Sequence, residues 1–293
     1  MRKDKSRMSY IFTALITFAA GYLALCALVY FRQSSYVYYP TREVAVTPEY
    51  YDLDYEELRL KTEDGETIHA WFVDGRKGPG SPDAVEGGDR TRATILFCHG
   101  NGGNISDRVY TLEVLCRMGF DVLIFDYRGY GGSTGSPDEA GTYSDASACW
   151  RHLVENRGID PGKIALFGRS LGGAVAARLA SIKNPGALII ESTFTSAPDM
   201  GARMFPFLPV RLLSRFRYRT IEAIKELNCP VLIAHSRDDE MVPFEHGQRL
   251  FTAAREPKVF VKMSGSHNEG GLESNNAYQE RFTQFLSEYV TGR

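Results

Sequence analysis

Short, uninterrupted apolar runs alternate with helical stretches along most of the 293-residue chain. A strand in a parallel sheet is covered on both faces, so its residues are apolar without the alternation of a half-exposed strand. Strands that alternate with helices form such sheets through right-handed crossovers. We therefore predict an α/β fold with a mostly parallel central sheet flanked by helices. The expected strands are ATILFCHG, DVLIFDYRG, KIALFG, GALIIES, PVLIAHS and KVFVKMSG.

Helical stretches fill the intervals between these runs. We expect helices at about 107–118, 143–155, 171–182, 244–254 and 275–290. Ahead of them, two strand-like segments flank Asp64-Gly65, a dipeptide that favours a hairpin turn. Residues 75–92 are rich in Gly, Pro and charge, which predicts a surface loop rather than a linker between domains. One domain is therefore expected from residue 50 to residue 291.

The N-terminal region departs from this globular pattern. Residues 10–31 contain no charged side chain, and a helix of that length covers roughly 33 Å, enough to cross the apolar core of a bilayer. Four basic residues precede this segment and two follow it closely. The positive-inside rule then places the basic tail, residues 1–9, in the cytoplasm and the main domain on the extracytoplasmic side. A cleaved signal peptide and a buried core helix are the two alternatives.

A serine stands at the junction between an expected strand and the helix after it. Gly168-Arg169-Ser170-Leu171-Gly172 matches the pattern G-x-S-x-G. The glycines allow close passage of the backbone in a sharp, strained turn. The dipole at the start of the following helix favours negative charge that develops near the serine. We expect Ser170 to be a nucleophile; the alternative is a small residue in a structural turn.

A serine hydroxyl becomes a nucleophile when a base takes its proton and an acid orients that base. His267 follows the last expected strand, so it can reach a site at the carboxyl ends of the strands. Asp238 and Asp239 both follow the preceding strand, and both can supply the acid. Serine, acid and histidine then follow one another in a known chain order for such a triad.

Other chemistries find less support in the sequence. His235, Asp238, Asp239 and His246 could bind a metal, but their spacing is irregular, and we expect neither a metal nor a cofactor. The glycine-rich FCHGNGGN is no dinucleotide-binding loop, because Ile105 stands where the last glycine is required. A net charge of −2 gives no sign of a nucleic-acid partner.

Two glycine-rich loops follow expected strands and lie near the proposed nucleophile. A tetrahedral intermediate needs hydrogen-bond donors for its oxyanion. The loop at 97–104 can present the main-chain N–H of Asn101, and the N–H of Leu171 follows the nucleophile directly. In the other loop, at 126–137, we expect Asp126 and Arg128 to form bracing hydrogen bonds; a purely structural turn is the alternative.

Residues 197–219 interrupt the alternation of strands and helices. The stretch is aromatic, contains proline and carries five arginines. We expect a lid over the site, and contact with a membrane surface is compatible with that role. The alternative is a packed helical insertion with solvated arginines.

The chain resembles the α/β-hydrolase superfamily, in particular its membrane-anchored bud-emergence-46-like branch, near the serine-aminopeptidase-like hydrolases. The resemblance runs over about residues 50–290 and rests on HGNGGN, DYRGYGGSTGSP, GRSLGG, ESTFTS, DDEMVP and GSHNE. It implies Ser170 as nucleophile, His267 as base and, through the following EMVP, Asp239 as acid. It also implies Asn101 and Leu171 as oxyanion donors, and it agrees with an N-terminal anchor.

We therefore expect a serine hydrolase anchored by one transmembrane helix, residues 10–31. Its expected substrates are small or lipid-like esters or thioesters with an acyl chain, cleaved through an acyl-enzyme without a cofactor. A peptidase or amidase on the same triad is one alternative. A non-catalytic membrane scaffold with a hydrolase fold is the other.

Overall fold

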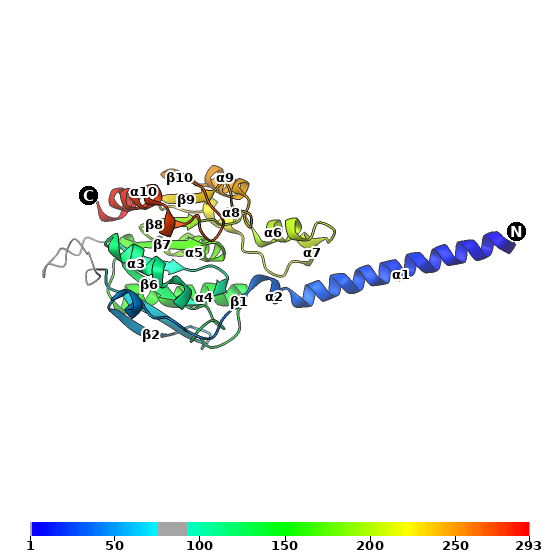
Figure 1. Cartoon of the computed structure of the whole chain (residues 1–293), viewed down its shortest axis with the longest axis horizontal. Helices are drawn as coiled ribbons and strands as arrows, with labels where there is room; N and C mark the ends of the chain where they lie inside the picture. The colour runs from blue at the N-terminus through cyan, green and yellow to red at the C-terminus, as the bar shows by residue number, and fades with distance from the viewer. Residues whose placement is uncertain (1, 76–92, 293) are drawn as a thin grey trace.

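The computed structural model of the chain describes residues 2–75 and 93–292. Its main strands are β2 (Tyr55–Lys61), β3 (Thr67–Val73), β4 (Thr94–Cys98), β6 (Asp121–Phe125), β7 (Ile164–Arg169), β8 (Ala187–Glu191), β9 (Val231–Ser236) and β10 (Lys258–Met263). They form one eight-stranded sheet in the order β10-β9-β8-β7-β4-β6-β3-β2 (Figure 1). Neighbours are parallel from β10 to β6, whereas β3 pairs antiparallel with β6 and with β2.

The prediction of a mostly parallel α/β sheet is confirmed. Each of the six apolar runs contains one strand, and the expected hairpin joins β2 to β3. Gly65 in that turn has φ 95°, a left-handed conformation that glycine adopts without strain. Of the loop expected at 75–92, only Gly75 belongs to the described residues.

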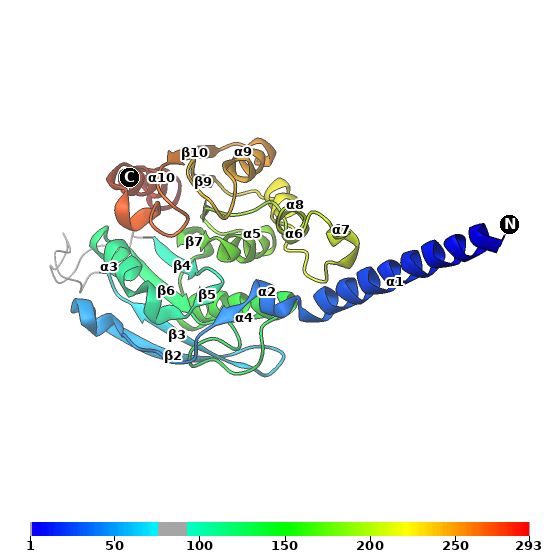
Figure 2. The same ribbon diagram turned by 45° about the vertical axis from the view of Figure 1, so that its right-hand side comes forward.

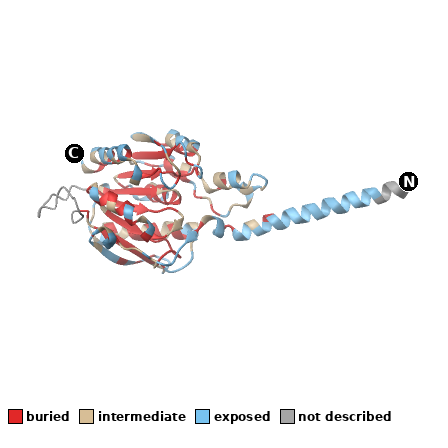
Figure 3. Ribbon diagram, viewed as in Figure 1, coloured by how far each residue is buried: buried red, intermediate tan, exposed pale blue. Residues whose placement is uncertain are grey.

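Helices cover both faces of the sheet (Figure 2). One face carries α4 (Glu139–Arg151), α5 (Leu171–Lys183), α8 (Thr220–Lys225) and α9 (Phe244–Ala253); the other carries α3 (Val109–Arg117) and α10 (Asn276–Leu286). In β7, Leu166 joins the core under α4 and α5, whereas Ala165 and Phe167 join the core under α3 and α10. Because helices cover both faces (Figure 3), the inner strands β4, β6, β7 and β8 are apolar and buried along nearly their whole length, whereas the edge strand β2 has exposed charged positions.

Two expected helices have different bounds in the structure. Helix α4 begins at Glu139 rather than at 143, because the Asp138 side chain accepts the N–H of Gly141 and caps it. The stretch expected as one helix at 107–118 is a 3-10 turn, Ile105–Arg108, followed by α3. In α4 the first turn is polar, so apolar periodicity does not mark its start. Ahead of α3, the side chain of Asn104 accepts the N–H of Ser106 and caps the 3-10 turn.

The N-terminal helix α1 (Arg2–Arg32) projects away from the sheet (Figures 1 and 2). Its segment Arg7–Arg32 is 26 residues long with a mean hydropathy of 2.1, and 6 % of its most apolar window is buried. This exposure excludes the core-helix alternative. The length and composition fit both a membrane anchor and a signal sequence.

The chain that follows α1 is fastened to the carboxyl edge of the sheet. After α2 (Ser34–Val37), β1 (Tyr39–Pro40) pairs in parallel with β5 (Gly102–Gly103), which lies in the loop after β4. The 197–219 segment folds into α6 (Ala197–Met204) and α7 (Val210–Leu213) near the same edge (Figure 1). This edge therefore gathers loops from distant parts of the chain.

Candidate active site

Ser170 stands in a sharp turn between β7 and α5. Its φ of 54° and ψ of −118° are strained for a residue that carries a side chain. A Cβ at Gly172 would lie 1.9 Å from the main-chain oxygen of Cys98, and one at Gly168 would lie 2.4 Å from that of Gly172. Both positions therefore require glycine, and the turn presents the Ser170 hydroxyl at the carboxyl edge of the sheet.

His267 connects Ser170 with Asp239. Its Nε2 lies 3.1 Å from Oγ of Ser170, and its Nδ1 lies 2.8 Å from Oδ2 of Asp239. When Nδ1 carries the proton, it donates to the carboxylate and leaves Nε2 to accept the serine hydroxyl. The three side chains come from the loops after β10, β7 and β9, so the sheet topology brings them together.

The structure distinguishes the two neighbouring aspartates. Asp239 is buried, and its Oδ1 accepts the N–H groups of Met241 (3.0 Å) and Val242 (2.7 Å). These bonds hold its other oxygen toward His267. The carboxylate of Asp238 instead accepts the N–H of Gly265 over 3.1 Å. Of the two candidates for the acid, the structure places Asp239 on the histidine.

The pKa of Asp239 is held below its ordinary value, although burial by itself favours the neutral carboxyl group. The hydrogen bond and charge of His267, together with the N–H of Val242, outweigh burial. The carboxylate is therefore ionised at neutral pH and can stabilise a positively charged imidazole.

Asn101 and Leu171 line the same cavity as Ser170. Leu171 is the first residue of α5, where an N–H has no acceptor within the helix. In the described part of the chain, neither this N–H nor that of Asn101 donates to a protein group. The Asn101 carbonyl accepts the N–H of Tyr39 (3.0 Å) and the hydroxyl of Tyr130 (2.8 Å), which fixes the loop. Two such donors beside a serine suit an oxyanion.

An apolar cavity of about 470 Å³ opens beside Ser170. Its volume lies within the roughly 300–1,000 Å³ that small-molecule sites occupy. Much of the wall comes from α6, α7 and the chain between them. Val29 of α1 and Gln33, the residue directly after this helix, form another part of the wall. This contribution was not evident from the sequence, which predicted α1 only as an anchor.

The profile of the family described as serine aminopeptidase, S33, matches residues 89–221. The α/β hydrolase domain-containing protein WAV2 of Arabidopsis thaliana is 35 % identical to this chain, over 97 % of this chain and 96 % of WAV2. The chain belongs to the α/β-hydrolase superfamily. The protein bem46 of Schizosaccharomyces pombe is 33 % identical to this α/β-hydrolase, over 94 % of this chain and 93 % of bem46. The predicted family resemblance is thus confirmed.

A solved structure shows the same fold. The Pyrococcus furiosus esterase Pf2001 matches this α/β-hydrolase with a TM-score of 0.67 at 21 % identity, over 87 % of this chain and 98 % of the esterase. At that identity the likeness establishes the shared architecture alone.

Arg169 ties the serine turn of this α/β-hydrolase to the loop that carries His267. Its Nη2 donates to the main-chain oxygens of His267 (3.2 Å) and Asn268 (3.0 Å). Its Nη1 donates to Glu273 (3.0 Å), and its Nε lies 3.1 Å from Glu191. Sequence reasoning missed Arg169 and Glu191. The available signal was a carboxylate that ends an apolar strand beside an arginine inside the G-x-S-x-G pattern.

Glu191 lies at the end of β8, fully covered by the fold. Burial raises the pKa of its carboxyl group to about 7 against the opposing charge of Arg169, and the neighbouring Glu273 adds to the rise. Arg169 thus contacts the carboxyl groups of both Glu191 and Glu273 as well as the loop that carries His267.

Two side chains of the loop after β6, Asp126 and Arg128, form hydrogen bonds to neighbouring segments near the site. Oδ1 of Asp126 accepts the N–H of Ile105 over 2.9 Å. Arg128 donates to Asp145 (3.0 Å from Nε) and to Asp64 (2.7 Å from Nη1). The expected bracing role of Asp126 and Arg128 is confirmed, and neither residue lines the cavity.

Each histidine of the alternative metal site has a nearer polar partner outside that site, although Nε2 of His235 also lies 3.6 Å from Oδ2 of Asp239. Nε2 of His235 lies 2.8 Å from the carbonyl of Val242, and Nδ1 of His246 lies 2.9 Å from Oγ1 of Thr195. Within residues 2–75 and 93–292, no three His, Cys, Asp or Glu side chains are grouped so that they could hold a metal ion.

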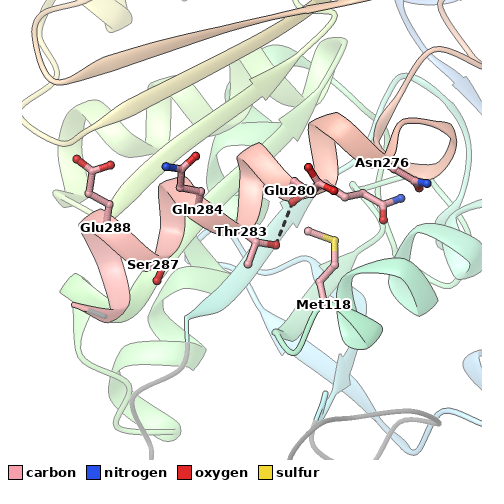
Figure 4. Close-up of a pocket in the computed structure, with 8 residues that line it drawn as sticks. Met118, Asn276, Glu280, Thr283, Gln284, Ser287 and Glu288 are labelled. Atoms are coloured by element: carbon pink, nitrogen blue, oxygen red, sulfur yellow. Dashed lines mark hydrogen bonds between the residues drawn. The ribbon is translucent and has the colours of Figure 1, made fainter.

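A larger hollow of about 790 Å³ lies along α10, and it is open to the surface (Figure 4). Its lining consists of Met118, Asn276, Gln279, Glu280, Thr283, Gln284, Ser287 and Glu288. Oγ1 of Thr283 donates to the main-chain oxygen of Gln279 over 3.0 Å. Among the described residues that line the hollow there are hydroxyl groups but no histidine to activate them, so size alone does not identify the reactive site.

Proposed function

We propose that this α/β-hydrolase is a membrane-anchored serine hydrolase that cleaves carboxylic esters or thioesters of acyl groups. The observation that carries the proposal is the hydrogen-bonded line from Asp239 through His267 to Ser170. A base held in this way makes the serine hydroxyl a nucleophile. Helix α1 supplies the anchor, because its apolar length matches a bilayer.

The first half of the reaction forms an acyl-enzyme. Oγ of Ser170 attacks the substrate carbonyl carbon while Nε2 of His267 takes the hydroxyl proton. As negative charge develops on the carbonyl oxygen, this oxygen accepts hydrogen bonds from the N–H groups of Asn101 and Leu171. When the tetrahedral intermediate collapses, the bond to the alcohol or thiol breaks, and His267 gives its proton to that leaving group.

The second half releases the acid. Water gives a proton to His267 and attacks the acyl carbon, and the bond to Ser170 breaks as the proton returns to the serine oxygen. Asp239 stabilises the positively charged imidazole in both halves. The proposed reaction uses these side chains, the two main-chain N–H groups and water.

The cavity lining favours an acyl substrate over a peptide. Segment 197–219 forms the lid of the cavity in this proposal and presents mainly apolar side chains to it. An aminopeptidase needs carboxylates to hold a free amino terminus. Among the described lining residues, Glu240 is the acidic one, and its carboxylate already accepts the N–H of His267 over 3.1 Å. A peptidase on the same triad, as the matched family description suggests, is the second candidate.

Labelling with a fluorophosphonate probe tests the proposal. Such probes react with activated serines, and the full chain in detergent or vesicles is the sample. We expect Ser170→Ala to abolish labelling, and we expect the matched control Ser181→Ala, a half-buried serine of α5, to label like wild type. Labelling that survives Ser170→Ala contradicts the assignment, and an unlabelled but folded wild type contradicts the proposed activity.

The orientation of α1 is a separate part of the proposal. The charge pattern places the N-terminus in the cytoplasm and the hydrolase domain on the opposite side of the membrane. A C-terminal reporter that is active only outside the cytoplasm should be active, and the mass of the membrane-bound protein should include residues 1–31. A cleaved N-terminus would establish the signal-peptide alternative.

A further inference from the structure

The segment Met204–Leu213, here called the tip, is bound to the N-terminal helix. The Tyr22 hydroxyl donates to the main-chain oxygen of Phe207 over 2.9 Å. The Gln33 amide donates to the carbonyl of Leu213 (2.7 Å) and accepts the N–H of Arg215 (2.7 Å). Figures 1 and 2 show α7 beside the part of α1 that is nearer the domain. The tip therefore lies beside α1 at the position of Tyr22 along the helix.

Tyr22 lies inside the charge-free stretch of α1, residues 10–31. Tyr22 precedes Arg32 by about ten residues, which is roughly 15 Å along a helix. When residues 10–31 span a bilayer, Tyr22 lies within the hydrocarbon region. Its hydrogen-bond partner Phe207 must then lie at a similar depth.

The side chains of the tip suit that depth. Phe207 is 89 % exposed, Leu212 is 84 % exposed and Met204 is 58 % exposed. Neighbouring large apolar side chains this exposed indicate an interaction surface. The one charged side chain within the tip, Arg211, forms an ion pair with Asp199 over 3.3 Å.

Most of the tip's backbone also suits an apolar environment, where an unpaired N–H group is costly. Pro206 and Pro209 have no N–H to pair. The N–H groups of Phe205, Leu208, Val210, Leu212 and Leu213 all donate to carbonyls within residues 201–209. The Phe207 carbonyl has the Tyr22 hydroxyl as its donor.

The cavity beside Ser170 extends to the junction of the tip with α1. Its wall includes Phe205 and Leu208 of the tip and Val29 of α1. We infer that the tip enters the bilayer beside α1 and that the cavity opens there, so the substrate is a bilayer-resident lipid ester whose acyl chain enters from the hydrocarbon. The inference rests on the proposed function, because it names the substrate class of the same serine.

Depth-dependent quenching tests the position of the tip. Phe207→Trp is compared with the matched control Ile182→Trp, at an exposed apolar position near the far end of α5. Both full-length variants are reconstituted in phosphatidylcholine vesicles whose acyl chains are brominated, and the buried Trp71 and Trp150 contribute the same background to each. We expect strong quenching for Phe207→Trp only. Equal quenching in the two variants overturns the inference.

Two esters with one leaving group test the route of the substrate. Methylumbelliferyl oleate, incorporated in vesicles, is compared with soluble methylumbelliferyl butyrate. Phe207 and Leu212 do not line the cavity. We expect Phe207→Asp with Leu212→Asp to lower oleate hydrolysis about ten-fold or more, because a carboxylate resists entry into hydrocarbon. Butyrate hydrolysis and fluorophosphonate labelling should persist, which shows that the protein is folded, and Ile182→Asp should change neither rate.

The outcomes separate this inference from the proposed function. Normal labelling of Ser170 with an unchanged ratio of oleate to butyrate hydrolysis in the tip variant overturns the lipid route and leaves the serine hydrolase proposal intact. Absence of labelling and of butyrate hydrolysis in wild type overturns the proposed function and the substrate class together. The quenching experiment then still decides whether the tip enters the bilayer.

Discussion

Arg169 donates a hydrogen bond from Nη2 to the main-chain oxygen of His267 over 3.2 Å. The residue before the proposed nucleophile thus holds the loop that carries the proposed base. Arg169 touches neither reacting atom, so its role is to position His267 relative to Ser170. The same guanidinium also faces Glu191 and Glu273.

We expect Arg169→Lys to lower kcat about 10- to 100-fold with KM nearly unchanged, because small displacements of a catalytic group reduce the rate by such factors. Lysine keeps the positive charge but cannot reproduce the planar fork that reaches both the carboxylates and the carbonyls. Steady-state kinetics well below the measured Tm provide the test. A variant with wild-type kcat, or a loss that merely follows the unfolded fraction, would mean that Arg169 has only a structural role.

The two neighbouring aspartates provide a matched pair of variants. We expect Asp239→Asn to lower kcat about a thousand-fold or more, because an amide at this position favours the wrong histidine tautomer. Asp238→Asn retains an oxygen for the N–H of Gly265 and should stay close to wild-type activity. Ester hydrolysis by the two purified variants decides the matter, and a larger loss for Asp238→Asn would transfer the acid role to that residue.

The raised pKa of Glu191 predicts a pH-dependent stability. Its carboxyl group titrates near 4.5 in an unfolded chain and at about 7 in the fold. A raised folded-state pKa stabilises the fold fully below the unfolded pKa, and this contribution is lost as pH rises through the folded pKa.

Glu191→Gln keeps a neutral group at every pH. We therefore compare the free energy of unfolding of Glu191→Gln with that of wild type. We expect this difference to rise in favour of Glu191→Gln by up to about 3 kcal/mol as the pH rises from below 4.5 to above 7. Denaturant unfolding in detergent at several pH values measures this gain. Glu226→Gln, at an exposed glutamate of the same domain, is the control and should show no such trend. Parallel pH curves for wild type and Glu191→Gln would contradict the prediction.

The serine turn predicts a steric effect at Gly172. An added Cβ would lie 1.9 Å from the rigid main-chain oxygen of Cys98, so we expect Gly172→Ala to lower stability by about 3 kcal/mol and to reduce labelling of Ser170. Gly102→Ala is the control, because no atom of the residues that the structure describes lies within 4 Å of its added Cβ. Thermal unfolding and fluorophosphonate labelling of both variants provide the comparison. Equal stability of the two would show that the turn can relax.

The sequence by itself determined the parts of this protein that depend on nearby residues. Continuous apolar runs identified the parallel strands because both faces of the sheet are covered, and Asp64-Gly65 identified the hairpin. The pattern around Ser170 identified the strained turn, and at Gly168 the glycine requirement is local, because an added Cβ would meet the main-chain oxygen of Gly172. The charge-free run at 10–31 identified a helix long enough for a bilayer.

Only the tertiary structure decided which distant groups meet. The directions of two loops after separate strands place Asp239 rather than Asp238 on His267. The contact of Arg169 with the His267 loop and that of Tyr22 with the tip join positions far apart along the chain. Propensity and periodicity act over a few residues, whereas such contacts follow from the order of strands in the sheet. For that reason, the part of α1 in the cavity wall became evident only in three dimensions.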